Sequence, residues 1–134
     1  MPLRISLKPF ERLIINGASI RNGSKAADFL IESHCKFIRE SEIIRDSEAD
    51  TPAKVICVTL QVIHLANDPT EAQGLLFAQA VELLKAMPSA ATFLLKIQDA
   101  LAAGQTYVAL KAGKQLMYHE RDLMAARKED TRAA

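Results

Sequence analysis

The sequence predicts an α+β protein, in which a small antiparallel sheet or barrel of four or five short strands precedes a bundle of about four helices. Before Thr51, short β-branched runs are separated by Asn16-Gly17 and Asn22-Gly23. Asn-Gly is a strong hairpin signal because both turn positions need a positive φ. After Thr51, every segment has a helical pattern that starts with proline or polar residues. We therefore expect a β subdomain at 1–50, ending in an acidic connector, and a helical subdomain at 51–134, together forming one compact unit.

The first strand is predicted at Leu3 to Leu7, where apolar and polar residues alternate as in a half-buried strand. Lys8 and Pro9 break this pattern. Further strands are expected at Phe10–Ile15, at Ala18–Arg21, near Ala26–Glu32 and, as a short fifth strand, at Cys35–Ile38. Strands this short leave open edges, so we expect either closure into a barrel within one chain or pairing with a second chain.

The formal net charge of +1 conceals a segregation of charge along the chain. The connector Glu40–Asp50 holds five acids and one base, whereas the cations of the strand half outnumber its acids by seven to three. Clustered cations bind phosphates by releasing counter-ions. One basic face of the sheet is therefore expected to bind nucleic acid, the alternative being a solvated surface. Its expected contacts are Arg4, Arg12, Arg21, Lys25, Lys36 and Arg39.

The helical half begins at Thr51-Pro52, an N-cap followed by proline at its favoured first position. This helix runs to about Ala66 and is apolar on nearly every side, so we expect it to be buried all round, although its β-branched content also allows a strand. Three more helices are expected: one from Asp68-Pro69 with Glu71 as a capping acid, one from Pro88-Ser89 to before Gly104, and one from about Gln105 to Arg127 ahead of a frayed tail at 128–134.

The last helix has two distinct faces. Apolar residues that recur every seven positions form a seam for another helix, in this chain or in a partner: Leu110, Leu116, Met117, Leu123 and Met124. A basic stripe with one aromatic residue lies roughly opposite part of this seam: Lys111, Lys114, Tyr118 and Arg121, extended by Lys128. Such a stripe suits a single RNA strand, with the ring stacked on a base, or it is simply a solvated face.

No motif in the chain indicates catalysis. The sequence has no Gly-rich phosphate loop followed by Lys, no CxxC and no HExxH, and His34, His64 and His119 are far apart. His34 is adjacent to Cys35, but neighbours on a strand point to opposite faces and do not share a metal. We therefore expect no enzymatic activity, no metal site and no cofactor.

The composition indicates a cytoplasmic protein. Cys35 and Cys57 lie in apolar contexts typical of buried thiols, which fits a reducing compartment. The segment Met1–Ile15 is interrupted by charges and a proline, so it does not have the pattern of a secretory leader. The longest strongly apolar stretch, Val55–Ala66, is too short to span a bilayer, and no membrane partner is expected.

Several segments resemble the FlbT family of flagellum biosynthesis repressors: Met1–Pro9, Glu11–Gly17, Cys35–Glu40, Glu42–Ile44 and Asp50–Lys54. The resemblance covers roughly 1–126. It implies a bacterial cytoplasmic regulator that associates with the 5′ untranslated region of flagellin messenger RNA and promotes its degradation, alongside a second small regulator, FlaF. In some bacteria the family's effect on flagellin is positive. The resemblance supplies no catalytic or RNA-contacting residues.

We therefore expect a messenger RNA-binding regulator of flagellin synthesis that acts as a homodimer or a higher homo-oligomer. The alternative is a protein-interaction module without RNA binding, which docks FlaF or flagellin through its last helix. The order of strand, Gly turn and strand, with alternating basic residues, is also similar to the carbon-storage regulator family, whose strand-exchanged dimers bind messenger RNA leaders. This second similarity is one of fold only, because the motifs do not match residue by residue.

Overall fold

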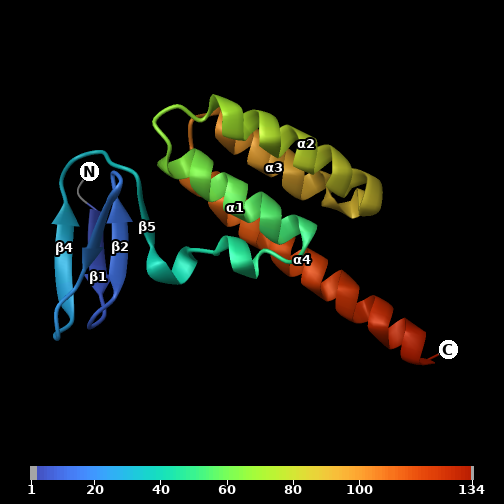
Figure 1. The fold of residues 1–134 in the computed structure, drawn as a ribbon, viewed down its shortest axis with the longest axis horizontal. Helices are drawn as coiled ribbons and strands as arrows, with labels where there is room; N and C mark the ends of the chain where they lie inside the picture. The colour runs from blue at the N-terminus through green and yellow to red at the C-terminus, as the bar shows by residue number, and fades with distance from the viewer. Residues whose placement is uncertain (1–2, 134) are drawn as a thin grey trace. The chain divides into compact units, whose positions relative to one another are not determined.

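The computed structural model describes residues 3–133, with side chains to residue 128. The chain divides into two compact units, Met1–Ile43 and Ile44–Ala134, so the division falls inside the acidic connector. The strands lie in the first unit and the four α-helices in the second (Figure 1). The predicted α+β class, with short antiparallel strands before a set of helices, is confirmed.

The first unit contains two small antiparallel sheets. Its strands are β1 (Leu3–Leu7), β2 (Arg12–Ile15), β3 (Ala18–Arg21), β4 (Ala27–Ile31) and β5 (Phe37–Arg39). One sheet has the order β1-β4 and the other β3-β2-β5. Ile5 and Leu7 of β1 and Leu13 of β2 are buried together and form the core of this unit. Because side chains alternate between the faces of a strand, this core defines an inner face on each sheet and leaves the other face outward.

The two Asn-Gly pairs have different roles. Asn16 (φ 48°) and Gly17 (φ 82°) both have positive φ and join β2 to β3 as predicted for a hairpin turn. Asn22 and Gly23 do not have positive φ, and β4 pairs with β1 rather than with β3. The Asn22 amide instead donates hydrogen bonds to the main-chain carbonyls of Lys8 and Lys25, both at 2.9 Å. The hairpin expected there is wrong, because this side chain ties two loops together instead of reversing a strand.

The acidic connector forms two short 3₁₀ turns, η1 (Glu40–Glu42) and η2 (Asp46–Glu48). In each turn the third residue accepts a hydrogen bond from the residue before the turn: the amide of Arg39 donates to Glu42 (3.3 Å), and that of Arg45 donates to Glu48 (3.1 Å). Gln61 on the first helix exchanges two hydrogen bonds with the main chain of Ile44, at 2.6 and 2.9 Å. The Gln61 side chain therefore fixes the connector to helix α1 at the main chain of Ile44.

The second unit consists of α1 (Pro52–Leu65), α2 (Thr70–Ala86), the 3₁₀ turn η3 (Pro88–Ala90), α3 (Ala91–Ala102) and α4 (Thr106–Ala133). Helix α1 packs against α2 and α4, and α3 packs against α4. Their shared core includes Ile56, Leu60, Ile63, Ile97 and Leu116. Because α4 continues to Ala133, the frayed tail predicted after Arg127 is wrong for all but the last residue, which lies outside the described part of the chain.

The predicted side-chain cap is confirmed for α1 but not for α2. The Thr51 hydroxyl accepts a hydrogen bond from the Lys54 amide (3.3 Å), as expected of an N-cap ahead of Pro52. Helix α2 begins one residue later than predicted, after Pro69, which makes no side-chain cap. The Asp68 carboxylate instead accepts hydrogen bonds from the amide and the hydroxyl of Thr70, the first helical residue.

Helix α1 is not buried all round, contrary to the prediction. Val62 is 51% exposed, whereas Thr59, Gln61 and His64 are buried polar residues that replace aliphatic ones on the inner side. Their hydrogen bonds explain why they tolerate burial: Thr59 bonds to Gln79 on α2 (2.8 Å), and His64 bonds to Thr106 at the start of α4 (2.7 Å).

Helices α1 and α4 approach each other closely at Gly113. A Cβ atom added to Gly113 would lie 2.8 Å from Cδ1 of Leu60 and 3.3 Å from Sγ of Cys57. Both neighbours are buried, and burial raises the pKa of the Cys57 thiol to about 12, so this cysteine stays a neutral packing group. Cys35 is half-buried rather than buried.

We expect Gly113→Ala to destabilise the helical unit. Overpacking a filled core costs about 1–3 kcal/mol, which exceeds the gain of at most about 1 kcal/mol from helix propensity. The matched control is Gly74→Ala on α2, where an added Cβ meets no atom within 4 Å. This variant should gain up to about 1 kcal/mol. Chemical denaturation followed by circular dichroism measures both changes, and equal effects at the two positions would contradict the packing argument.

Candidate nucleic-acid interface

The outward face of α4 carries alternating aromatic and basic residues. Viewed along the helix, these residues follow one another at intervals of four, three, four and three, which places them on a single face: Tyr107, Lys111, Lys114, Tyr118 and Arg121. We call this set the α4 basic face. The opposite face of the same helix is buried in the core, with Ala109 and Leu116 fully inaccessible. Packing of α4 therefore leaves Lys111, Tyr118 and Arg121 exposed, whereas Lys114 and Tyr107 are half-buried, and the Tyr107 ring centre lies 6.0 Å from that of His64 on α1.

Two cation–π pairs order the α4 basic face. The Lys111 ammonium lies 5.1 Å from the centre of the Tyr107 ring, and the Arg121 guanidinium lies 5.0 Å from the centre of the Tyr118 ring. Tyr118 is nevertheless 41% exposed. Sequence reasoning missed Tyr107, although its position four residues before Lys111 was a sufficient signal for inclusion.

Few acidic side chains on the described part of α4 are placed to neutralise these cations. Glu120 is buried, and its carboxylate accepts a hydrogen bond from the Ala53 amide at the start of α1 (3.0 Å). Asp122 lies 3.4 Å from Arg121 in an exposed contact, which has little energetic weight. Lys128 is exposed two turns beyond Arg121, and Arg127 beside it is exposed as well. The α4 basic face therefore keeps a positive potential.

The cations of the strand unit do not share one face, contrary to the prediction. Arg4 is opposite Leu30 on the outer face of the β1-β4 sheet. It pairs with Asp28 at 2.7 Å, and Asp28 also accepts a hydrogen bond from Ser6 (2.7 Å). The hydrogen bond from Arg4, followed by that from Ser6, lowers the pKa of Asp28 below its usual value. Arg4 is thus largely neutralised by the protein's own acid.

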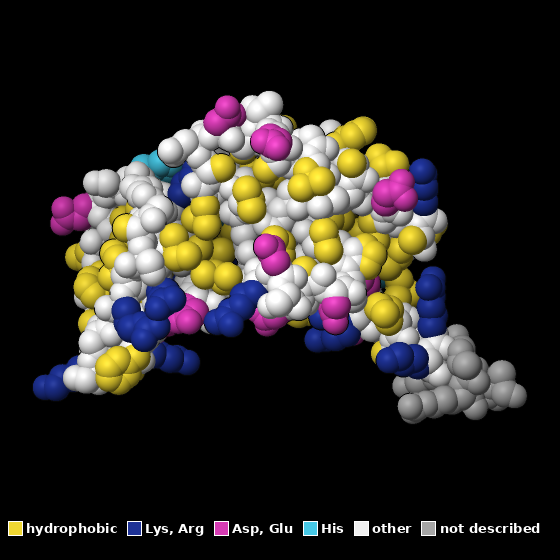
Figure 2. Space-filling view, in the orientation of Figure 1, with side chains coloured by type: hydrophobic (Ala, Val, Ile, Leu, Met, Phe, Trp, Pro, Cys, Tyr) yellow, Lys and Arg dark blue, Asp and Glu magenta, His cyan; other side chains and the backbone are white. Residues whose placement is uncertain are grey.

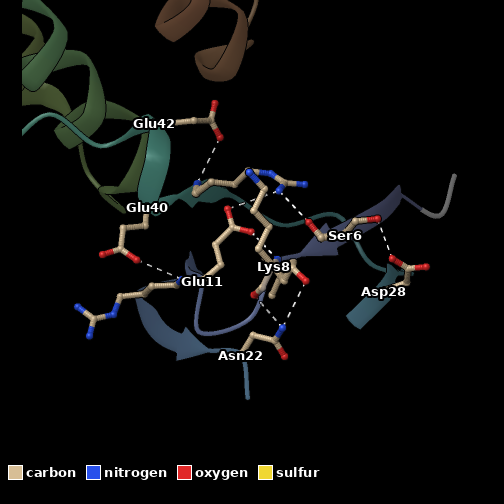
Figure 3. Close-up of polar contacts among 10 residues, drawn as sticks. Ser6, Lys8, Glu11, Asn22, Asp28, Glu40 and Glu42 are labelled. Carbon is tan, nitrogen blue, oxygen red and sulfur yellow. Dashed lines mark hydrogen bonds and ion pairs between the residues drawn. The ribbon is translucent and has the colours of Figure 1, made fainter. Parts of the chain in front are cut away.

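Arg39 has a structural role. The register of β5 places it opposite Leu13, on the inner side of the β3-β2-β5 sheet. Its guanidinium donates a hydrogen bond to the main-chain carbonyl of Ser6 on β1 (2.9 Å) and lies 3.8 Å from the carboxylate of Glu11. Figure 3 shows Ser6, Glu11 and Asn22 gathered in this polar cluster, which holds the two sheets and their loops together.

Arg12 and Arg21 are directly opposite each other on β2 and β3. Because the neighbouring Leu13 points into the core, both arginines lie on the opposite face of their sheet, where Ile38 is fully buried, Arg12 is half-buried and Arg21 is exposed. None of the described acids forms a salt bridge with either side chain. Lys25 is exposed in the loop between β3 and β4, and Lys36 is half-buried just before β5. Like charges directly opposite each other are unfavourable, so this pair is suited to an anion.

The predicted partner-binding seam of α4 is largely used within the chain. Leu116 is fully buried, and Leu110, Met117 and Leu123 are partly buried and pack against the core of the helical unit. Leu116 is therefore excluded as a docking residue. Met124 is 47% exposed and is the member of the set that retains a substantial solvent-facing surface.

The hollows of the structure are mainly apolar. A cavity of about 370 Å³ opens between the two sheets and is lined largely by aliphatic residues such as Ile5, Leu13 and Ile20. A groove of about 500 Å³ lies between the start of α1 and α2, beside Asp50 and Glu82. Within residues 3–128, no three His, Cys, Asp or Glu side chains come together as a metal site. Among the described helices, none has the length and hydropathy needed to cross a bilayer.

Comparison with known proteins identifies relatives along nearly the whole chain. The family model described as "Flagellar protein FlbT" matches residues 3–124. A relative from Rhodopseudomonas palustris (strain TIE-1), named "Probable flagellum biosynthesis repressor protein FlbT", is 34% identical over 125 residues, which cover 93% of this chain and 99% of the relative.

Two other relatives have similar names. One from Bradyrhizobium diazoefficiens, named "Probable flagellum biosynthesis repressor protein FlbT 1", is 31% identical over 92% of this chain and 85% of its own length. The "Flagellum biosynthesis repressor protein FlbT" of Caulobacter vibrioides is 32% identical over 48% of this chain and 46% of its own length. No solved structure matches the chain.

The opposed arginines generate a prediction about stability. We expect Arg21→Glu to raise the free energy of unfolding of the strand unit by about 0.2–1 kcal/mol, because it replaces a like-charge pair with an ion pair to Arg12. Lys25→Glu, in the adjacent exposed loop, is the control and should change stability much less. Urea denaturation at low ionic strength measures both, and a loss of stability in Arg21→Glu would show that Arg12 and Arg21 do not repel each other.

The lowered pKa of Asp28 generates a prediction about pH. A carboxyl group whose pKa is depressed on folding stabilises the protein above its unfolded pKa of about 3.9 and loses this contribution as the pH falls through the folded value. We therefore expect Asp28→Asn to be less stable than wild type at neutral pH, with the difference vanishing in acid. Unfolding measured across this pH range tests it, and a difference that persists at the lowest pH would contradict the ion-pair explanation.

Proposed function

The chain belongs to the FlbT family, and on this premise we propose that it regulates flagellum biosynthesis after transcription, by binding the 5′ untranslated region of flagellin messenger RNA and promoting its degradation. The names of the relatives support a repressor of flagellum biosynthesis. The α4 basic face supports RNA as the direct ligand, because it combines cations for phosphates with rings for bases.

The α4 basic face is the principal contact in this proposal. Its residues extend over about 14 positions of one helix, or about 21 Å at 1.5 Å per residue. Lys111, Lys114 and Arg121 bind successive phosphates, while Tyr118 stacks on an unpaired base of a loop. Arg121 already lies against the Tyr118 ring, so the guanidinium and the ring are ordered before RNA arrives.

Arg12 and Arg21 form a second contact in this proposal. A phosphate placed between them accepts hydrogen bonds from two guanidinium groups and removes their mutual repulsion. Lys25 in the neighbouring loop and Lys36 before β5 contribute to the potential around this pair. Arg4 and Arg39 are omitted from the proposed contacts, since the protein's own acids and carbonyls bind them.

The proposal assigns no catalytic step to the protein itself. Degradation of the bound message is carried out by a cellular nuclease, to which binding exposes the leader. The same binding event stabilises the message when the nuclease site is covered instead, so the sign of regulation depends on where on the leader the protein binds. The protein acts in the cytoplasm, where messenger RNA and its nucleases are present.

The rival function is a module that docks FlaF or flagellin through α4 without binding RNA. Leu116 is buried, and Leu110, Met117 and Leu123 pack against the core. Little of the predicted apolar seam of α4 is therefore available to bind a partner. Met124→Glu separates the two functions. Under the proposal this variant binds flagellin leader RNA as wild type does, and loss of FlaF or flagellin binding together with the flagellin phenotype would favour the rival.

RNA binding by the α4 basic face predicts a steep dependence on salt. The logarithm of affinity should fall by about 0.7 per phosphate contact for each unit of log salt concentration. We expect the triple variant Lys111→Ala, Lys114→Ala, Arg121→Ala to bind a flagellin leader more weakly and with a slope smaller by about 2. Filter binding at several salt concentrations measures affinity and slope together.

Two further variants make this measurement specific. Lys96→Ala removes an exposed cation from α3 in the same unit and should leave the slope unchanged. Tyr118→Ala should lose about 1–3 kcal/mol of stacking, whereas Tyr118→Phe retains the ring and should bind nearly as wild type. Binding that is indifferent to salt, or a triple variant that binds as tightly as wild type, would rule out the α4 basic face as the RNA contact.

A further inference from the structure

Helix α2 has an apolar face that the described part of the helical unit leaves uncovered. Phe77 is 74% exposed, Val81 is 36% exposed and Leu84 is 37% exposed. Their spacing of four and three residues places them on one side of the helix, away from Leu76 and Leu83, which face the core. A solvated helix face is normally polar, so this α2 apolar stripe indicates a docking surface. Figure 2 shows hydrophobic side chains, with few charges between them, over much of the visible face of the helical unit.

We propose that the α2 apolar stripe binds the same stripe of a second copy of this chain, with the two helices antiparallel. When Phe77 packs against the second copy's Val81, the same register places Leu84 opposite the second copy's Gly74. Gly74 leaves room for this side chain, because an added Cβ there would meet no atom within 4 Å. Two-fold symmetry then repeats each contact, so one stripe supplies both the knobs and the holes.

The charges flanking the stripe complement each other in this same register. Glu71 in the first turn of α2 falls within two residues, about 3 Å along the helix, of the second copy's Lys85, and the two-fold symmetry repeats this pair between Lys85 and the second copy's Glu71. Within its own chain, Lys85 contacts Glu82 at 3.3 Å in an exposed pair of little energetic weight. A parallel pairing instead faces Gly74 with Gly74 and gives Glu71 no basic partner. Size and charge therefore select a second copy in the antiparallel orientation.

The size of the contact sets the expected affinity. A helix of 17 residues is about 26 Å long, and pairing it with its copy buries less than the roughly 800 Å² per partner of a standard interface. We therefore expect a dimer that forms in the micromolar range. Helix α1 contacts both α2 and α4, so the pairing uses a different helix from the α4 basic face and does not depend on the proposed RNA binding.

Charge exchange tests the pairing. We expect wild type to pass from monomer to dimer between about 1 and about 100 µM in sedimentation equilibrium. Lys85→Glu and Glu71→Lys should each weaken the dimer about tenfold or more, because each places like charges together. The double variant Glu71→Lys, Lys85→Glu should restore it. Leu75→Lys, an exposed residue on the other side of α2, is the matched control and should leave the dimer intact. Circular dichroism confirms that every variant keeps its helices.

Cross-linking tests the register independently. The antiparallel pairing places Phe77 beside the second copy's Val81, so a mixture of Phe77→Cys and Val81→Cys chains, both in a Cys35→Ser background, should form a disulfide-linked dimer on oxidation, whereas Leu75→Cys in that background should not. A wild type that stays monomeric at about 100 µM, as it would if the strand unit or another protein covered the stripe, overturns the proposal. Dimerisation that is insensitive to both single charge exchanges, or cross-linking of Leu75→Cys equal to that of the mixture, overturns it as well.

Discussion

Burial of one side of α4 against α1 is the constraint on which the helical unit depends. The two helices approach so closely that Gly113 has no room for a side chain between Leu60 and Cys57. Leu116 and Ala109 are fully buried on the same side. Once this side faces inward, the helical period places Tyr107, Lys111, Lys114, Tyr118 and Arg121 together on another face of α4, where Tyr107 and Lys114 are half-buried and the other three are exposed. The α4 basic face is thus a consequence of core packing, and its order comes from cation–π pairs along the helix.

Strand register has the corresponding role in the first unit. The core formed by Ile5, Leu7 and Leu13 determines which residues face inward. The position of each cation in the strand register then decides on which face of its sheet it lies. Arg39 therefore reaches into the structure, whereas the Arg12 and Arg21 pair lies on the opposite face of the same sheet. The strand unit thus presents one pair of opposed arginines instead of a broad basic surface.

The two surfaces described on the helical unit lie on different helices. The α4 basic face lies on one helix and the α2 apolar stripe lies on another, while α1 contacts both helices. In the two proposals taken together, a dimer formed through α2 presents the α4 basic face of each copy to one transcript. Binding at two linked sites then raises the overall affinity without new contacts.

The sequence by itself determined the order of elements, most of their bounds and the placement of Lys111, Lys114, Tyr118 and Arg121 on one stripe of a helix, because turns, caps and helical periodicity are local properties. The Asn16-Gly17 turn, the Thr51 cap and the spacing from Lys111 to Arg121 all have the expected structure. Tertiary structure alone decided which strands pair, what Asn22 binds, that Arg39 turns inward and that Leu116 is buried. These outcomes depend on contacts between residues far apart in the chain, and local sequence patterns do not specify such partners.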